Sequence, residues 1–399
     1  LSYCLCYNYL VLNVCMANFL TSSLGRLFDF QRLGLFKQED NSIVGIDIGS
    51  SSIKAVQIRK ENGKAVLETY GELATGPYKE AQVGQAAILT PDKLVEALSD
   101  LFRAANITTK NVAIAIPLRA SLLTVIELPK VDQAKINEMV PLEARKYVPV
   151  PMSEVALDWF VIPKKEASLG DTPGSFEEPN YGRKPLDVVE VLVVAIHNNI
   201  ISQYQSVISK MGLNAKPYEI ETFSSIRSVF GRDMGAMAVI DMGASSTRVS
   251  VVDYGITRVS HTINKGSQDI TSALAQSLGI EFVKAEEIKR RLGTVGSING
   301  GEMGTIVTPS LDYILFEARR IILSYEKKYS RSISRVVLIG GGALLKGFTE
   351  IATKSLDAEV VLGNPFAKLE TPAFLEPVLR DAGPSFSVAI GVALRDITL

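Results

Sequence analysis

The chain is poor in the residues that build disulfides and thiol active sites. Of its 399 residues only three are cysteines, Cys4, Cys6 and Cys15, and all of them precede Met16. The rest of the sequence offers neither a disulfide framework nor a catalytic thiol, which fits a reducing cytoplasm. The two histidines, His197 and His261, are interpreted as structural residues.

The sequence also lacks an excess of charge of either sign. Its 42 Lys and Arg residues nearly balance its 43 Asp and Glu residues, and the net charge is -1. Without a basic run to neutralise a phosphate backbone, the chain does not resemble a nucleic-acid-binding protein. Its length predicts two domains or more, because one core rarely grows to this size.

The first residues differ from the rest. The chain begins with Leu1, and its first apolar stretch is interrupted by Asn8 and Asn13 with no basic segment before it. We expect translation to begin at Met16, with a signal peptide or membrane anchor as the alternative interpretation. Residues 16–36 mix apolar and basic side chains, a pattern that fits an amphipathic helix on a membrane surface. A helix docked on the protein itself, or a frayed tail, fits equally well.

Two segments of similar design carry most of the functional information. Residues 47–54 and 241–248 each follow an apolar strand with Asp-x-Gly, small or hydroxyl residues, a cation and a second strand. Residues without bulk let backbone amides and hydroxyls approach phosphate oxygens closely. Phosphate would repel Asp47 and Asp241 unless a cation lay between them, so both are predicted to bind Mg²⁺, and one to orient an attacking water. The pattern predicts a nucleotide between two similar domains.

The same residues are also common turn formers, so a single copy fits a plain hairpin turn. Two copies in matching strand contexts favour the phosphate site. The predicted phosphate contacts are Gly49, Ser50, Ser51, Ser52 and Lys54 in the first loop, and Gly243, Ala244, Ser245, Ser246 and Thr247 in the second.

A third segment, residues 335–348, runs from an apolar strand into three glycines. Glycines there let a flat ring approach the backbone, and the following helix presents its N-terminal amides. A tight strand-to-helix turn explains the same residues. Beside two phosphate hairpins, the segment predicts contacts to adenosine from Gly340, Gly341, Gly342, Ala343 and Leu345.

Apolar periodicity predicts an α/β chain with an inserted block. The expected strands are 43–47, 53–59, 65–72, 112–117, 122–128, 155–162, 188–196 and 257–262. The expected helices include one that opens at Thr90-Pro91, then 132–147, 220–230, 267–278, 283–292 and one from Thr308-Pro309 to about residue 329. Pro141 is expected to kink or split the helix that contains it.

These elements predict a domain order. Residues 1–41 form a tail, 42–109 and 188–234 the two parts of domain I, and 235–383 domain II. Residues 110–187 form an inserted subdomain with an exposed loop at 164–184, and residues 384–399 a C-terminal core helix.

In this order the motifs resemble the actin-like ATPase superfamily, and within it the family of PilM, a cytoplasmic actin-like protein of type IV pilus assembly related to FtsA. The matching stretches are 47–54, 143–149, 241–247 and 338–348, within a similarity that covers about residues 42–397. The resemblance implies an α/β, ribonuclease H-like duplicated fold of two domains with an inserted FtsA/PilM-type subdomain. It also implies that ATP and Mg²⁺ bind between the domains, with weak or regulatory ATPase activity.

The resemblance assigns further residues. Glu221 stands where superfamily members position the hydrolytic water, although a carboxylate there also suits a helix start. Glu286, Lys289 and Arg290 match a helix pattern that contacts ribose and adenine, although a solvated charged face is the alternative. Ala244 departs from the usual glycine of the second loop, and its Cβ favours binding over fast turnover.

By resemblance the partner is the N-terminal cytoplasmic peptide of PilN, bound in a groove formed with the inserted subdomain at the cytoplasmic face of the inner membrane. Other inner-membrane and motor components of the pilus machinery, and self-association, are further expected contacts. The alternatives are an FtsA-like division filament and a sugar or acetate kinase. The kinase is disfavoured because no third acidic residue stands at the expected strand end, and the filament because residues 388–397 read as core.

Overall fold

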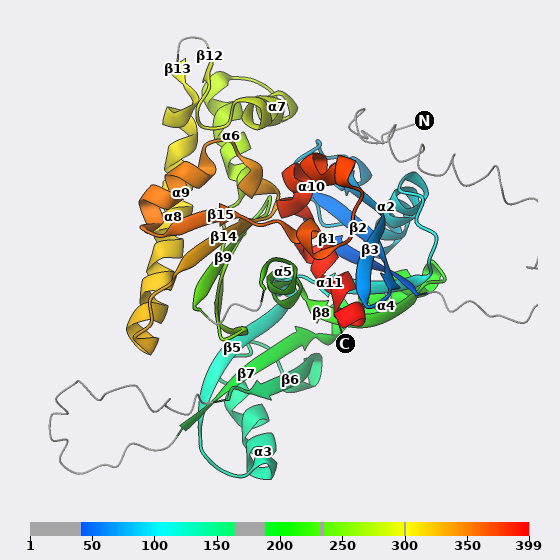
Figure 1. Cartoon of the computed structure of the whole chain (residues 1–399), viewed down its shortest axis with the longest axis vertical. Helices are drawn as coiled ribbons and strands as arrows, with labels where there is room; N and C mark the ends of the chain where they lie inside the picture. The colour runs from blue at the N-terminus through cyan, green and yellow to red at the C-terminus, as the bar shows by residue number, and fades with distance from the viewer. Residues whose placement is uncertain (1–40, 164–187, 232–234, 299–300, 399) are drawn as a thin grey trace, which may run out of the picture.

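The structure of the chain is a computed structural model that describes residues 41–163, 188–231, 235–298 and 301–398 (Figure 1). The expected start at Met16, the predicted segment 16–36 and the predicted loop 164–184 lie outside the described residues. Among the described residues, none of the helices combines the length and apolar character needed to cross a membrane.

Domain I is built on a five-stranded sheet whose order is β3-β2-β1-β4-β8. The first three strands are antiparallel neighbours: β1 (Ser42–Ile48), β2 (Ser52–Glu61) and β3 (Lys64–Ala74). On the other side of β1, strands β4 (Asn111–Ile116) and β8 (Asn214–Ile220) add in parallel. The middle of β1 is buried because helices cover both faces of the sheet.

Domain II repeats this arrangement. Its sheet has the order β11-β10-β9-β14-β15, formed by β9 (Met237–Met242), β10 (Thr247–Asp253), β11 (Ile256–Ile263), β14 (Arg335–Ile339) and β15 (Glu359–Leu362). Strands β9, β10 and β11 form antiparallel pairs, and β14 and β15 add in parallel. The two sheets share one topology, which confirms the predicted duplicated α/β fold.

Helices of the two domains cover these sheets. On domain I, α2 (Pro91–Ala104) and α4 (Asn198–Lys210) pack on one face of the sheet. As predicted, Thr90 caps α2 by accepting a hydrogen bond from the Lys93 amide, and Pro91 takes the first helical position. Domain II carries α6 (Ser267–Leu278), α7 (Phe282–Leu292), α8 (Met303–Tyr329) and α9 (Phe348–Leu356).

The long helix α8 begins earlier than predicted. It starts at Met303, so Pro309 lies inside the helix and not at its first position. Met303 and Val307 are fully buried in the domain II core, and this burial extends the helix beyond the proline signal. Between α7 and α8 lie the short strands β12 (Ser297–Ile298) and β13 (Gly301–Glu302).

The inserted subdomain has its own antiparallel sheet, of order β5-β7-β6, with α3 (Gln133–Ala144) packed on it. The strands are β5 (Ser121–Pro129), β6 (Val155–Val161) and β7 (Val188–His197). Helix α3 is continuous through Pro141 and ends before the predicted limit at residue 147. Figure 1 shows β5, β6, β7 and α3 of this subdomain at the bottom of the view.

The structure corrects three strand predictions. Strand β4, predicted in the inserted block, belongs to the domain I sheet, whereas β7, predicted to resume the domain I core, is the central strand of the inserted sheet. Strand β8 was not predicted at all. An apolar run fits the centre of either sheet, so its periodicity does not reveal which distant strand it pairs with.

The end of the chain returns to domain I. Phe366, Leu379, Phe386 and the buried side of α11 (Ser387–Thr398) form one core with β1 and β2. The remaining short elements are η2 (Gly76–Lys79), η3 (Leu118–Ala120), η4 (Met152–Glu154), η5 (Gly341–Leu344), η6 (Pro365–Lys368), η7 (Ala373–Leu375), α10 (Glu376–Ala382) and η8 (Gly383–Phe386).

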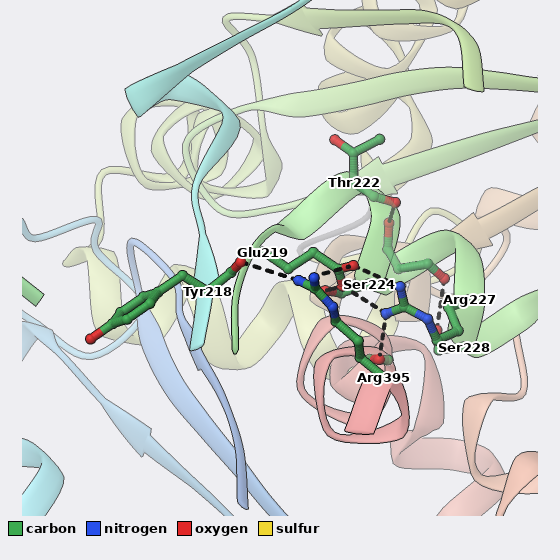
Figure 2. Close-up of polar contacts among 9 residues, drawn as sticks. Tyr218, Glu219, Thr222, Ser224, Arg227, Ser228 and Arg395 are labelled. Atoms are coloured by element: carbon green, nitrogen blue, oxygen red, sulfur yellow. Dashed lines mark hydrogen bonds and ion pairs between the residues drawn. The ribbon is translucent and has the colours of Figure 1, made fainter. Parts of the chain in front are cut away.

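Helix α11 is held against α5 (Glu221–Val229) by a charge cluster around the buried Glu219, which includes Arg227 and Arg395 (Figure 2). Both terminal nitrogens of Arg227 lie 2.6 Å from the Glu219 carboxylate, and one of them donates to the Gly391 carbonyl at 2.9 Å. Arg395 adds an ion pair with Glu219 at 3.7 Å. A bidentate arginine pair is among the stronger contacts that a protein makes, so the cluster fixes where α5 begins.

Close backbone approach requires a glycine at position 391. A Cβ atom placed on Gly391 would lie 1.7 Å from the Ser224 carbonyl oxygen. We therefore expect Gly391→Ala to lower the free energy of unfolding by about 2 kcal/mol or more, as overpacking does. Gly231→Ala is the matched control, because no atom of the described residues lies within 4 Å of its added Cβ. Urea unfolding of both variants tests this, and equal midpoints would contradict it.

Candidate functional site

The two predicted phosphate loops meet across the gap between the domains. Ser245 of the second loop donates a hydrogen bond to the Ser50 hydroxyl of the first, at 3.1 Å. Residues of both loops line one cavity of about 370 Å³, together with residues of α7 and the glycine segment after β14. Segments far apart in the sequence therefore form one site, as the repeated motif predicts.

Each loop is the turn of an antiparallel hairpin with an aspartate opposite a cation. Asp47 at the end of β1 pairs in register with Lys54 on β2, and Asp241 at the end of β9 pairs with Arg248 on β10. In the second loop the Gly243 amide donates to the Ser246 carbonyl at 3.0 Å and closes the turn. The duplication thus extends from the motif to the register of its charges.

Burial dominates the electrostatics of Asp47. It raises the pKa of this carboxyl to about 7, although the charge of Lys54 opposes the shift. The neighbouring carboxylates of Glu221 and Asp241 add to the increase. Groups with pKa values this far from the ordinary value concentrate at functional sites, where binding or chemistry requires burial and close charges.

Glu221 lies at the start of α5 and faces the same cavity. Its Oε1 accepts a hydrogen bond from the Leu118 amide at 2.6 Å and pairs with Nη2 of Arg248 at 2.8 Å. Burial raises the pKa of Glu221, and the charge of Arg248 opposes that shift. The carboxylate therefore joins the second hairpin to η3, which leads into the inserted subdomain.

The glycine segment reaches the second aspartate directly. Gly340 has a φ of +83°, and a Cβ there would lie 2.5 Å from Oδ1 of Asp241. Only glycine adopts this backbone without strain and leaves room for the carboxylate. Its amide donates to the Pro384 carbonyl at 2.8 Å, so the segment is also tied to η8.

Helix α7 contributes a buried polar group. Glu286 accepts hydrogen bonds from Thr271 at 2.6 Å and from Arg290 at 2.7 Å, and it pairs with Lys289 at 2.7 Å. Burial opposes ionisation of Glu286, but Lys289 and the hydrogen bonds hold its pKa below the ordinary value. Because Glu286 and Lys289 are buried, the alternative of a solvated charged face does not describe these two residues.

Most predicted site residues line the cavity. They are Asp47, Gly49, Ser50, Ser51, Ser52, Lys54, Glu221, Asp241, Gly243, Ala244, Ser245, Ser246, Glu286, Lys289, Arg290, Gly340, Gly341, Gly342 and Leu345. Two others do not line it. Thr247 is buried and donates its hydroxyl hydrogen to the Lys265 carbonyl at 2.8 Å, and Ala343 is a buried residue of η5.

The sequence did not single out several residues that the structure adds. Glu72 on β3 pairs with Lys54 at 3.4 Å, Arg119 of η3 lines the cavity, and Arg248 lies between two carboxylates. The repeated cation of the two hairpins was the one available signal for Arg248. Glu72 and Arg119 come from segments that carry no motif.

The carboxylates present suit Mg²⁺ shared with a phosphate. Magnesium is usually held by one or two carboxylates together with phosphate oxygens and water. Asp47 and Asp241 supply such carboxylates, whereas the described residues contain no group of three or more acidic, histidine or cysteine side chains that could hold a metal alone. A bound Mg²⁺ would neutralise negative charge shared by these carboxylates and the phosphates.

Comparison with known proteins identifies the family. The sequence profile of the family described as "Type IV pilus assembly protein PilM" matches residues 45–397. The chain belongs to this family. Among curated relatives, the cell division protein FtsA of Staphylococcus epidermidis is 24% identical over 362 residues, which cover 82% of this chain and 75% of that protein.

Solved structures confirm the actin-like fold of this PilM-family chain. A structure described as the PilM-PilN type IV pilus biogenesis complex superposes with a TM-score of 0.72 at 23% identity, covering 89% of this chain and 98% of that one. MreB5 of Spiroplasma citri bound to AMPPNP superposes with a TM-score of 0.50 at 10% identity, covering 90% and 97%. At these identities the likeness shows the fold.

Asp47 gives the site a measurable pH dependence of stability. Its folded pKa of about 7 lies above the ordinary 3.8, so the folded state retains a proton that the unfolded state loses. Stability then falls as pH rises from about 4 to about 7. We expect Asp47→Asn to remove this loss and to raise the free energy of unfolding at pH 8 by about 1–3 kcal/mol.

Urea unfolding in EDTA, without nucleotide, at about pH 5 and pH 8 measures the effect. Exposed Asp312 on α8 supplies the control, Asp312→Asn. The same change in stability for both variants, or a loss for Asp47→Asn at pH 8, would contradict the prediction.

Proposed function

We propose that this chain is an ATP-binding, actin-like component of type IV pilus assembly that acts as a regulated scaffold. The observation that supports ATP binding best is the meeting of the two loops, Ser50 against Ser245, at a cavity whose lining includes the carboxylates of both hairpins, Asp47 and Asp241. MreB5, a neighbour with the same fold, was solved with AMPPNP. Family membership supports the role in pilus assembly.

In this proposal each group of residues has a distinct role. Glycines and serines of the two loops donate hydrogen bonds to the phosphates, while Asp47 and Asp241 hold Mg²⁺ with them. The buried polar group of Glu286 and Lys289 and the segment 340–342 hold the nucleoside. Glu221 positions a water, and the proposed output is domain closure that partners sense.

A second cavity supports a peptide partner. It measures about 350 Å³ and is lined by residues of α2, α4 and η3, together with Ile88, which precedes α2, and His197 at the end of β7. Arg119 of η3 and Pro117, which precedes η3, line both cavities. A solved neighbour is a PilM-PilN complex, so we propose that this cavity takes the N-terminal cytoplasmic peptide of a PilN-like protein. Such binding would place the chain at the cytoplasmic face of the inner membrane.

Nucleotide binding is tested by titrating fluorescent ATP with and without Mg²⁺. Asp241→Ala should weaken Mg²⁺-dependent binding by about tenfold or more, because the metal loses a carboxylate ligand. Glu376→Gln, an exposed substitution on α10, serves as the control. Unchanged affinity in Asp241→Ala would remove this residue from the site, and a wild-type chain that binds no ATP would refute the function.

Peptide binding is tested with the synthetic N-terminal peptide of the PilN-like partner in the presence of ATP. Ile88 is 67% exposed and lines the second cavity, so Ile88→Asp should weaken binding by about tenfold without unfolding the chain. Phe374 is 69% exposed and lines neither cavity, which makes Phe374→Asp a matched control. Absence of saturable binding to the wild type would refute the partner.

An FtsA-like filament protein is the second candidate, because FtsA is among the similar curated proteins. ATP-dependent sedimentation of the wild-type chain would favour it. A chain that binds the peptide and stays in the supernatant with ATP would favour the scaffold.

A further inference from the structure

Arg248 has a buried side-chain nitrogen that makes no hydrogen bond to the described residues. Its side chain is 13% exposed, and its Nη2 lies 2.8 Å from Oε1 of Glu221 and 3.5 Å from Oδ2 of Asp241. Its Nη1 is buried and has no hydrogen-bond partner among the residues that the structure describes. A buried donor left unpaired costs about 1–3 kcal/mol, and more on a charged group.

The corresponding cation of the first hairpin, Lys54, has partners for its nitrogen. Lys54 donates to the Ser52 hydroxyl at 2.8 Å and pairs with Glu72 at 3.4 Å. Both cations stand opposite the aspartate of their hairpin, so the difference between them lies in their partners. On the second hairpin, therefore, Nη1 of Arg248 has no partner among the described residues, whereas Nζ of Lys54 on the first hairpin is paired.

A guanidinium in this position suits a phosphate. It presents donors in a planar fork that matches two phosphate oxygens, and it stays charged at all relevant pH values. Arg248 lines the cavity whose wall includes the loop Gly243–Ser246. Nη1 is buried in its present position, so it contacts an anion in the cavity only when the guanidinium turns away from Glu221 and toward that anion. Glu221 keeps the Leu118 amide as a partner after such a turn.

We propose that Arg248 binds the terminal phosphate of a nucleoside triphosphate and thereby distinguishes a triphosphate from a diphosphate in this chain. The proposal rests on the nucleotide site proposed above. A diphosphate lacks the outer phosphate that draws the guanidinium from Glu221, so its affinity does not depend on Arg248. With a triphosphate, a bidentate contact between Arg248 and the terminal phosphate replaces the lost ion pair with Glu221 and gives Nη1 a hydrogen-bond partner.

Calorimetric titration of the full chain with AMPPNP and ADP in Mg²⁺ tests the proposal. For Arg248→Gln we expect AMPPNP affinity to fall by about tenfold or more while ADP affinity changes by less than about threefold. Arg248→Lys keeps the charge without the fork, so its AMPPNP affinity should be intermediate. Lys265→Gln removes the same charge from an exposed residue outside the cavity and should leave both affinities unchanged.

Thermal melting of each variant checks that it is folded. Should Arg248→Gln fail to fold, Glu221→Gln tests the same exchange, because weakening the competing pair should raise AMPPNP affinity relative to ADP. An unchanged ratio of the two affinities, an equal loss of both, or tighter AMPPNP binding in Arg248→Gln would overturn the proposal. These results would leave the proposed nucleotide site intact, whereas a wild type that binds neither nucleotide would refute both.

Discussion

The structure depends on balancing buried carboxylates where the two domains meet. Asp47, Glu221 and Asp241 face one cavity, and burial raises the pKa of Asp47 and of Glu221. Lys54 and Arg248 oppose the effect of burial on Asp47, but burial dominates and the pKa of Asp47 stays raised. A divalent cation bound together with phosphates would add positive charge beside these carboxylates. Repulsion among these carboxylates lowers the stability of the protein without a ligand. A bound cation would relieve that repulsion, which favours binding.

The rest of domain I keeps these carboxylates in position. Glu221 begins α5, and α5 is tied to α11 by the hydrogen bond from Arg227 to the Gly391 carbonyl and by the close approach of Gly391 to Ser224. Helix α11 in turn packs on β1, which ends at Asp47. The C-terminal helix is therefore part of the support for the site. This explains why residues 388–397 are apolar on the side facing the sheet, as the sequence analysis predicted for a core helix.

Features that depend on neighbouring residues could be predicted from the sequence, whereas most features that depend on distant residues could not. Local signals were reliable: Thr90-Pro91 begins α2, α6 occupies the predicted residues 267–278, and both Asp-x-Gly turns are hairpins. The repeat of one motif was enough to predict that its two copies face each other. Strand partners over long distances were not predictable, so β4 and β7 were assigned to the wrong sheets. Arg248 was overlooked for a related reason, because its importance comes from Glu221, which precedes it by a whole hairpin strand and a helix.

The inserted subdomain contacts both domains at opposite ends of the same sheet. Its strand β7 carries Glu190, which accepts hydrogen bonds from Arg258 of β11 and from the Tyr329 hydroxyl at the end of α8, each at 2.7 Å. At the other end, η3 before β5 presents the Leu118 amide to Glu221. A change in the relative position of the domains must therefore strain one of these contacts or move the subdomain with them. Because η3 also lines the second cavity, that movement would alter the shape of the cavity proposed for the peptide, and the proposed nucleotide and peptide sites would then be coupled through η3.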